Sequence, residues 1–92
     1  VANQEVANSF FTEIFPNPAR EKAWLAVAFP KPQTLHLSLS DATGRVISAW
    51  TVRGVSEQNI LIDLKDLPAG TYPLQIRTAQ EIRMEKVVVG GD

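Results

Sequence analysis

Apolar and polar residues alternate along most of this 92-residue chain with a period of two, which is the period of β-strands. The clearest stretch is residues 35–40, in which three leucines alternate with His36, Ser38 and Ser40. Proline, glycine, aspartate and asparagine interrupt the alternation about every 8–12 residues. The pattern therefore predicts an all-β domain with almost no helix.

Seven strands are expected from this alternation. They are residues 10–15, 23–29, 35–40, 45–52, 59–64 and 72–76, and a last strand that runs through the three valines at 87–89. Proline lacks the N–H that a strand ladder uses, so Pro16 and Pro18 are expected to end the first strand, and Pro30 and Pro32 the second. Residues 53–59 are expected to form a loose connection.

Turn residues mark how the strands are joined. Asp41-Ala42-Thr43-Gly44 predicts a hairpin, because aspartate bonds back to nearby backbone and glycine adopts a positive φ. Residues 67–72 predict a second turn, with Tyr72 following it in the manner of a tyrosine corner. Pro73 stands beside an inward row, so we expect its nitrogen to point away from a partner strand or a bulge to lie there.

Seven short strands in this length favour an immunoglobulin-like antiparallel β-sandwich, with a small barrel as the competing architecture. We interpret residues 1–8, which are small and polar, as a linker from an upstream protein, and residues 9–92 as one folded domain. A chain that starts at Val1 without methionine is interpreted as a fragment of a longer protein.

Composition narrows the range of partners. Nine Lys+Arg against ten Asp+Glu give a formal net charge of −1. This balance does not indicate binding to nucleic acid or to an anionic membrane surface. The chain has no cysteine, so a disulfide framework and a thiolate zinc site are excluded. No apolar run reaches the ~18–20 residues of a membrane-spanning helix.

The residues do not predict an enzyme, a metal site or a cofactor. His36 is the single histidine and falls on a row expected to face solvent, so we interpret it as a surface histidine. Paired carboxylates from Asp63 with Asp66, or from Glu81 with Glu85, are interpreted as a solvated face, because acid–base work needs a cleft. Calcium at loop oxygens of Asp41, Asp63 or Asp66 has no dense D-x-D-x-D-G pattern to support it.

The two tryptophans leave two interpretations open. Trp24 and Trp50 can form a carbohydrate-stacking platform, or they can belong to the core, which is the commoner place for tryptophan in a sandwich with few aromatic residues. A generic immunoglobulin-like accessory or adhesion module of a secreted protein is an alternative that does not depend on the tryptophans, whereas the platform interpretation makes the chain a carbohydrate-binding module. We favour the core.

Four stretches, in order, carry a resemblance that spans nearly the whole chain: FPNPA at 15–19, SDATGRVISAW at 40–50, NILIDLKDLPAGTYPLQI at 59–76 and EKVVV at 85–89. Together they resemble the C-terminal sorting domain of the type IX secretion system. The resemblance implies a domain that is substrate rather than enzyme. Its partners would be the outer-membrane translocon, which recognises it in the periplasm, and a sortase-like cysteine protease, which removes it and joins the cargo to surface lipopolysaccharide.

The same resemblance implies an exported protein that ends at the cell surface or outside the cell. Cleavage is expected in or before residues 1–8, where an extended and unpaired backbone can enter a protease. Each matching residue also has a purely structural interpretation, in which prolines end a strand, glycines permit turns and the tyrosine fills the core. The residues that the resemblance marks are Pro16, Asn17, Pro18, Gly44, Gly70, Tyr72, Lys86, Val87 and Val88.

The last strand raises a question of phase. Counting from Ile82 and Met84 puts Lys86 in an otherwise apolar row with Val88. A bulge that turns Val87 inward, a lysine that guards a sheet edge, or recognition by a translocon would each explain it. An edge strand of this kind also predicts weak homodimers. The tail Gly90-Gly91-Asp92 departs from the family, whose members usually end at or just after this strand.

Overall fold

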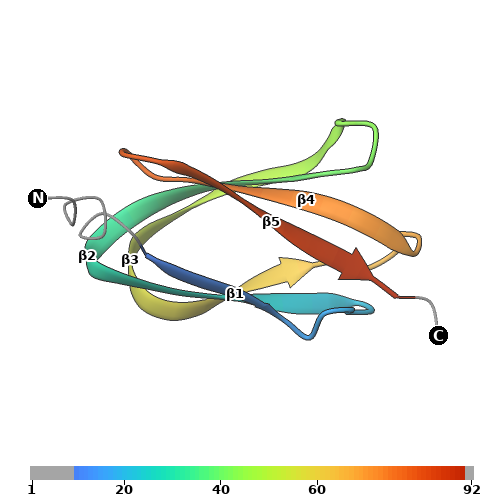
Figure 1. Ribbon diagram of the computed structural model, residues 1–92, viewed down its shortest axis with the longest axis horizontal. Coiled ribbons are helices and arrows are strands. Elements are labelled where there is room, and N and C mark those ends of the chain that lie inside the picture. Colours follow the sequence, from blue (N-terminus) through green and yellow to red (C-terminus); the bar gives the residue numbers. More distant parts are fainter. Residues whose placement is uncertain (1–9, 91–92) are drawn as a thin grey trace, which may run out of the picture.

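The computed structural model describes residues 10–90 of the chain, and these residues form five β-strands and no helix. The strands are labelled in Figure 1. They are β1 (Phe11–Phe15), β2 (Lys22–Ser40), β3 (Val46–Asp63), β4 (Gly70–Arg77) and β5 (Ile82–Val89). The predicted all-β class is therefore confirmed, while the interpretation of residues 1–8 as a linker lies outside the described residues.

All five strands belong to one antiparallel sheet. Its order is β1-β2-β4-β5, and β3 pairs with β2 from the other side. The seven-strand count is wrong, because residues 23–29 and 35–40 belong to the single strand β2, and residues 45–52 and 59–64 fall largely in β3. An immunoglobulin-like sandwich of seven strands is thus not confirmed, since one continuous sheet curls back on itself (Figure 1).

The prolines of β2 explain the miscount. Pro30 and Pro32 lie in a stretch that β3 does not pair, because the register passes from Ala28↔Glu57 directly to Gln33↔Val55. A proline costs a strand nothing where no ladder bond is made, so the chain bends there and continues as a strand. Both prolines are exposed.

A second irregularity explains why the expected connection at 53–59 is part of β3. Leu35 pairs with Val52 and Gln33 with Val55, so β3 carries an extra residue at this point. Gly54 has a φ of +65°, which is the backbone conformation that such a bulge requires. Val55 returns to the core with no exposed surface. Bulge and bend together let β2 and β3 curl as a pair.

The curl divides the sheet into two halves that share one core. The three-strand half consists of β1, residues 22–29 of β2 and residues 57–63 of β3, and the four-strand half consists of residues 33–40 of β2, 46–55 of β3, β4 and β5. Alternate residues of both halves are buried in a single apolar cluster. Its fully buried large side chains are Leu25, Leu35, Leu37, Leu39, Ile62, Leu64, Leu74, Ile76, Val27, Val55 and Val87.

The β2–β3 hairpin forms as the sequence predicts. Asp41 Oδ1 accepts bonds from the Thr43 backbone N–H at 2.9 Å, the Thr43 hydroxyl at 2.6 Å and the Arg45 backbone N–H at 3.0 Å. The Thr43 hydroxyl is the main reason why the pKa of Asp41 lies below its ordinary value of 3.8, and the two backbone N–H groups and the Arg45 charge act in the same direction. Gly44 has a φ of +94°, as expected for this turn.

The turn before β4 contains the predicted tyrosine corner. The Tyr72 hydroxyl donates to the Pro68 carbonyl at 2.6 Å, four residues upstream, while its ring is buried. Pro73 pairs with Lys86 in an unshifted register, so there is no bulge. The last β2–β4 pair is Leu39↔Leu74, so Pro73 lies just beyond that ladder. The proline therefore interrupts neither ladder register.

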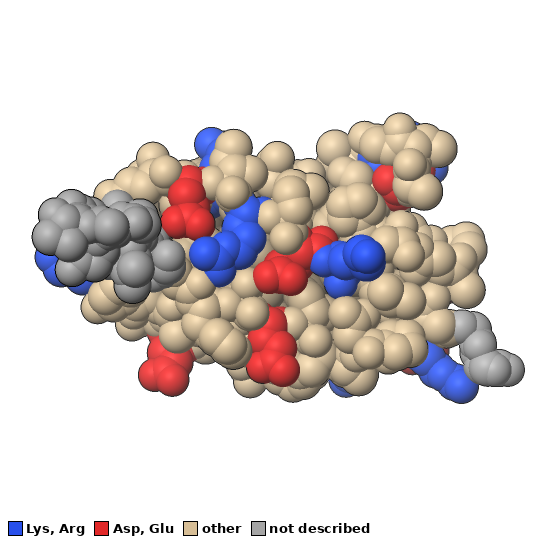
Figure 2. All heavy atoms as spheres, in the orientation of Figure 1, with Lys and Arg blue, Asp and Glu red and all other residues tan. Residues whose placement is uncertain are grey.

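Side chains close the sheet between β1 and β5, which do not pair with each other. The Arg83 guanidinium donates to the Phe10 carbonyl and lies 4.1 Å from the centre of the Phe10 ring. The Thr12 hydroxyl donates to Glu85. Figure 2 shows acidic and basic groups side by side across the middle of this view, where β5 crosses in Figure 1. We call this junction the β1–β5 seam.

Candidate functional site: the clamp on the terminal strand

The loop after β1 reaches across to the last strand. The Asn17 side chain donates from Nδ2 to the Lys86 carbonyl at 3.1 Å and accepts at Oδ1 from the Val88 N–H at 2.9 Å. A single amide group therefore pairs with two backbone groups of β5, as a neighbouring strand would. Both peptide bonds before Pro16 and Pro18 are cis.

Ala19 continues this pairing. Its N–H donates to the Val88 carbonyl at 2.8 Å, and its carbonyl accepts from the Gly90 N–H at 2.7 Å. Ala19 and Val89 thus form a parallel bridge, and Ala19 is 2% exposed. We call residues 16–19 together with their partners at 86–90 the clamp.

The clamp decides how much of the β5 edge is open. An edge strand normally presents unpaired N–H and C=O groups that invite other chains. On the side that faces away from β4, the clamp bonds to the Lys86 carbonyl, to both backbone groups of Val88 and to the N–H of Gly90, which directly follows β5. The C-terminal half of the last strand is therefore already paired within the chain.

Gly90 belongs to the clamp, although it begins the tail that departs from the family pattern. A Cβ at this position would lie 3.2 Å from Pro18 Cβ and 3.6 Å from Pro18 Cγ. The first contact is tighter than ordinary packing, so the Pro18 ring would have to shift by a few tenths of an ångström to admit a side chain, and glycine fits without that shift. Gly91 and Asp92 lie outside the described residues.

The phase of β5 answers the question raised by Lys86. Val87 and Val89 are buried, and Lys86 is exposed. The β4–β5 register runs without a shift from Gly70↔Val89 to Arg77↔Ile82, so the bulge interpretation is wrong. Ile82 and Met84 do share the face of Lys86, but that face points to solvent. Lys86 therefore does not place a charge in a buried row.

Several other marked residues gather around the clamp. Gly70 pairs with Val89 and Tyr72 with Val87, so the tyrosine corner supports the strand that Asn17 holds from its other side. Gly44 is placed elsewhere, in the β2–β3 hairpin. That hairpin and residues 69–72 line a shallow hollow of about 240 Å³. The structure therefore unites the first, third and fourth stretches of the resemblance, and the second lies beside them.

The contacts of some residues in this region are not predicted by the sequence. Arg83 and Glu85 point inward toward β1, and Arg83 also contacts Glu81 at 3.2 Å. The Phe10 ring, under the Arg83 guanidinium, stacks on Phe29 with ring centres 4.5 Å apart. The sequence signal for their orientation is that Arg83, Glu85 and Val87 occupy alternate positions, and alternate residues lie on the same side of a strand. Their contact with β1 depends on the curl and has no local signature.

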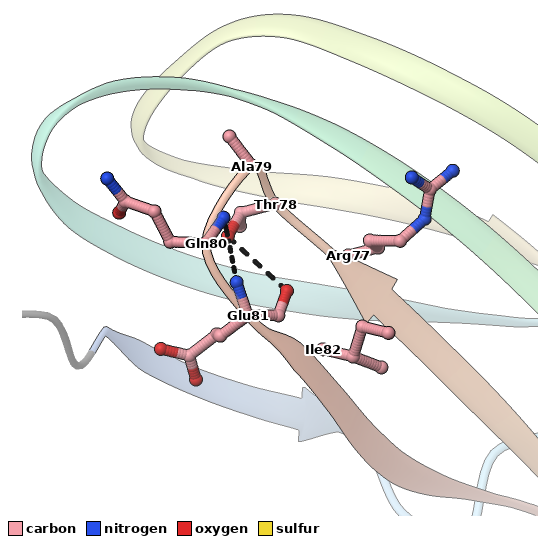
Figure 3. Close-up of a pocket in the computed structure, with 6 residues that line it drawn as sticks. All are labelled: Arg77, Thr78, Ala79, Gln80, Glu81 and Ile82. Atoms are coloured by element: carbon pink, nitrogen blue, oxygen red, sulfur yellow. Dashed lines mark hydrogen bonds between the residues drawn. The ribbon is translucent and has the colours of Figure 1, made fainter.

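The β4–β5 hairpin forms a second hollow, of about 450 Å³, drawn in Figure 3. The buried Thr78 hydroxyl accepts from the N–H groups of Gln80 and Glu81, each at 3.1 Å. Its backbone N–H donates to the Glu81 carbonyl at 2.9 Å. The polar groups of this turn are bonded to one another, so the hollow is the outline of a tight turn.

His36 and Trp50 lie apart from the clamp, whereas Trp24 lines a hollow together with the clamp residues Pro16, Pro18 and Ala19. His36 is on the outward side of β2, with Nδ1 3.2 Å from the Thr51 hydroxyl. Trp50 packs against the core, as predicted. Trp24 does not: it is half-buried on the outer side of the three-strand half, between Phe15 and Leu61 in neighbouring strands. No group of acidic or histidine side chains within residues 10–90 could hold a metal ion.

The fold and the clamp define a class of protein, namely a small all-β domain whose last strand is tied into the sheet by a loop near its start. The sequence profile described as "Secretion system C-terminal sorting domain" matches residues 13–90. The chain belongs to this family, the C-terminal sorting domains of type IX secretion cargo. It is thus a secretion signal that directs export across the outer membrane.

A solved structure has the same fold. The chain superposes on part of the crystal structure of dimeric latent PorU from Porphyromonas gingivalis with a TM-score of 0.68 and 20% sequence identity. The match covers 90% of this chain and 9% of that one, so the chain corresponds to about a tenth of that protein's length. No curated protein matches the chain. Within the described residues there is no helix long and apolar enough to cross a membrane.

Proposed function

We propose that this domain is read as a folded unit in the periplasm by the outer-membrane translocon, and that a sortase-like cysteine protease then removes it and attaches the cargo to the cell surface. The observation that carries the proposal is the clamp. Asn17 and Lys86 are 69 positions apart and belong to two different stretches of the resemblance. A hydrogen bond joins them. A linear tail signal would not need the first stretch.

The marked residues have distinct roles in this proposal. Pro16, Asn17 and Pro18 hold the terminal strand, while Gly70 and Tyr72 form the other side of its setting. Lys86 and Val88 are exposed or half-exposed and are the residues that a partner can touch, whereas Val87 is buried and acts through the fold. Gly44 shapes the hairpin.

We place the proteolytic cut before Phe10. A protease needs an extended and unpaired backbone in its active site. The Phe10 carbonyl is bonded to Arg83, its ring lies between the Arg83 guanidinium and Phe29, and β1 is paired with β2 from Phe11 onward. Cleavage within β1 would therefore require the sheet to open first.

The test uses a reporter with an N-terminal export signal, fused in front of residues 1–92. It is produced in a bacterium with an active type IX system and in an otherwise identical strain that lacks the system. We expect delivery to the surface or medium in the first strain alone, with a mature reporter that has lost the mass of residues 10–92. Mass spectrometry of the released fragment locates the cut.

Two controls accompany this experiment. A fusion that ends at Glu85 lacks the buried Val87 and Val89 and is expected to remain in the periplasm. A fusion with an unrelated β domain of similar size tests whether any compact C-terminal domain is exported. Wild-type fusion that remains folded and intact in the periplasm of the active strain would contradict the proposal.

The homodimer expected from the sequence has a more definite candidate edge in the structure. β3 is 18 residues long and pairs with β2 on one side, whereas the C-terminal half of β5 is clamped. We propose that any weak self-association of the domain uses β3. Sedimentation velocity of residues 1–92 over a concentration series tests this, and Thr51→Pro, which removes an N–H from β3, is the matched variant.

Saccharide binding is the second candidate function, and the placement of Trp24 is the observation that favours it. Phe15, Trp24 and Leu61 form a row across three strands on an outer face, with Phe15 37% and Leu61 47% exposed. Aromatic rings in such a row can stack on sugar rings. Titration of tryptophan fluorescence with oligosaccharides tests this function, because Trp50 is packed against the core and Trp24 is the ring that a sugar would reach.

A further inference from the structure

The outer face of β4 and β5 combines exposed apolar side chains with positive charge. Ile82 is 59% exposed and Met84 is 55% exposed, and they are neighbours on the outward side of β5. Lys86 follows on the same side, and Arg77 of β4 stands directly opposite Ile82. We call Arg77, Ile82, Met84 and Lys86 the basic-apolar face.

The charges of this face are all of one sign. Among the described residues, the outward positions of β4 and β5 hold two cations, Arg77 and Lys86, and no carboxylate. The outward side of the three-strand half has the opposite balance. It holds one cation and three carboxylates, which are Lys22, Glu13, Glu57 and Asp63. A chain with a net charge of −1 thus separates its charges between two faces.

The clamp closes the C-terminal half of β5 to strand addition by a partner. A receptor that adds a strand to a sheet bonds to the outward N–H and C=O groups of the edge strand. Asn17 and Ala19 already bond to four of these groups, from the Lys86 carbonyl to the Gly90 N–H. Over this C-terminal half, which the clamp closes, a partner meets β5 through its outward side chains, and the exposed side chains of Ile82 and Met84 lie on the same face.

We propose that the basic-apolar face is the docking surface of the domain, and that its partner is a protein surface in which carboxylates surround an apolar depression. Ile82 and Met84 enter the depression, and Lys86 and Arg77 pair with the carboxylates at its rim. This inference rests on the proposed function and deepens it, because it names the face that is read and the chemistry that reads it. Apolar anchors within a charged rim are the usual anatomy of specific protein interfaces.

An anionic lipid surface fits the face less well than a protein does. Sequences that bind such surfaces carry clusters of about 4–8 Lys or Arg residues. The outward side of β4 and β5 has two, and the opposite face of this small domain is acidic. The apolar pair Ile82 and Met84 also forms a compact patch, which suits a shaped depression.

The first test compares matched variants of the full fusion in a bacterium with an active type IX system. Lys86→Glu reverses a charge on the proposed face, and Lys22→Glu does the same on the other face. Met84→Ser removes an apolar side chain that is 55% exposed, and Phe11→Ser removes one that is 54% exposed on the three-strand half. We expect the two face variants to lower delivery about tenfold or more, and the two controls to change it less than about twofold.

All four sites are solvent-exposed, so little change in thermal unfolding is expected, with the largest decrease for Lys22→Glu, which puts a carboxylate opposite Asp63. Thermal unfolding of each purified domain is measured alongside. Delivery of Lys86→Glu and Met84→Ser at the wild-type level would overturn the inference. So would equal losses for the variants of both faces. If the wild-type fusion is delivered and the fusion ending at Glu85 is not, the proposed function stands even when the inference fails.

The second test identifies the occupant of the face. A photo-crosslinking amino acid replaces Met84 in one fusion and Phe11 in another, and the cells are irradiated during secretion. The expected product is a protein adduct at position 84 alone, whose crosslinked peptide is apolar and has Asp or Glu beside it. A lipid adduct, an adduct with a second copy of the domain, or no adduct at position 84 would each overturn the inference.

Discussion

The two halves of β5 have opposite relations between side-chain polarity and burial. From Lys86 to Val89 the valines at 87 and 89 point into the core, and Lys86 points to solvent. From Ile82 to Glu85 the apolar Ile82 and Met84 are more than half exposed, while the charged side chains face β1. The register with β4 is continuous through both halves. Polarity alone therefore does not tell which side of this strand is inside.

The surroundings of each half explain the inversion. The C-terminal half lies against the apolar core and is held at its edge by Asn17 and Ala19. The N-terminal half lies beside the start of β1, where Arg83 and Glu85 find the Phe10 carbonyl, the Phe10 ring and the Thr12 hydroxyl. Charged groups are tolerated on the inward side where partners satisfy them. The apolar side chains of that half are then left outside, where they are available to a partner.

The largest effect should come from placing the same acidic residue in each half. Val87→Asp buries a carboxylate without a partner and is expected to lower the free energy of unfolding by about 4 kcal/mol or more, because an unpaired buried charge is strongly destabilising. Met84→Asp changes an exposed side chain and is expected to change that free energy by less than about 0.5 kcal/mol. Chemical denaturation measures both. Similar losses at the two positions would break the comparison.

A smaller loss is expected from the β1–β5 seam. Arg83→Met keeps an apolar stem but removes the bond to the Phe10 carbonyl, the contact with Glu81 and the cation–π interaction, at a cost of about 1–2 kcal/mol. Arg77→Met on the outer face of β4 is the matched control and should be nearly neutral. Equal stability of the two variants would mean that the seam charges are only tolerated, without stabilising the fold.

The clamp should respond more locally than globally. Asn17→Ala removes two hydrogen bonds to β5, but water can replace them at this exposed site, so we expect a loss of about 1 kcal/mol. Amide hydrogen exchange at Val88 should become about tenfold faster or more, since its N–H loses its acceptor. The Tyr72 amide serves as the internal control, because Tyr72 lies in β4, on the side of β5 opposite the clamp. Unchanged exchange at Val88 would show that the clamp does not close the edge.

The smallest effect on β5 is expected from acid. The pKa of Asp41 is lowered in the folded state, chiefly by the Thr43 hydroxyl, so its contribution to stability is present above the unfolded pKa and is lost as pH falls through the folded value, below about 3.8. The amides of Thr43 and Arg45 should report this loosening by NMR. The Val88 amide should not follow the same titration, and Asp41→Asn should abolish it at the hairpin. If the Val88 amide titrated with the same midpoint as the amides of Thr43 and Arg45, the hairpin and the terminal strand would be coupled, contrary to this prediction.

Much of the fold follows from local chemistry. The alternation at 35–40 identifies three buried leucines, Asp41 to Gly44 form the expected hairpin, and Tyr72 makes the expected corner with Pro68. These predictions succeed because each depends on residues within a few positions of one another. The strand count fails for the complementary reason. A proline ends a strand only where a neighbour needs its N–H, and the partner of residues 29–32 is not a local property.

The sequence by itself determined the all-β class, the inward row of leucines at 35–39, the hairpin and corner chemistry, and the family to which the domain belongs. The tertiary structure alone decided that Asn17 and Ala19 close the edge of β5, that Gly90 fits beneath Pro18, and that Arg83 and Glu85 turn inward. The physical reason is sequence separation. These contacts join residues about seventy positions apart, and the curl of β2 and β3 is what brings them together.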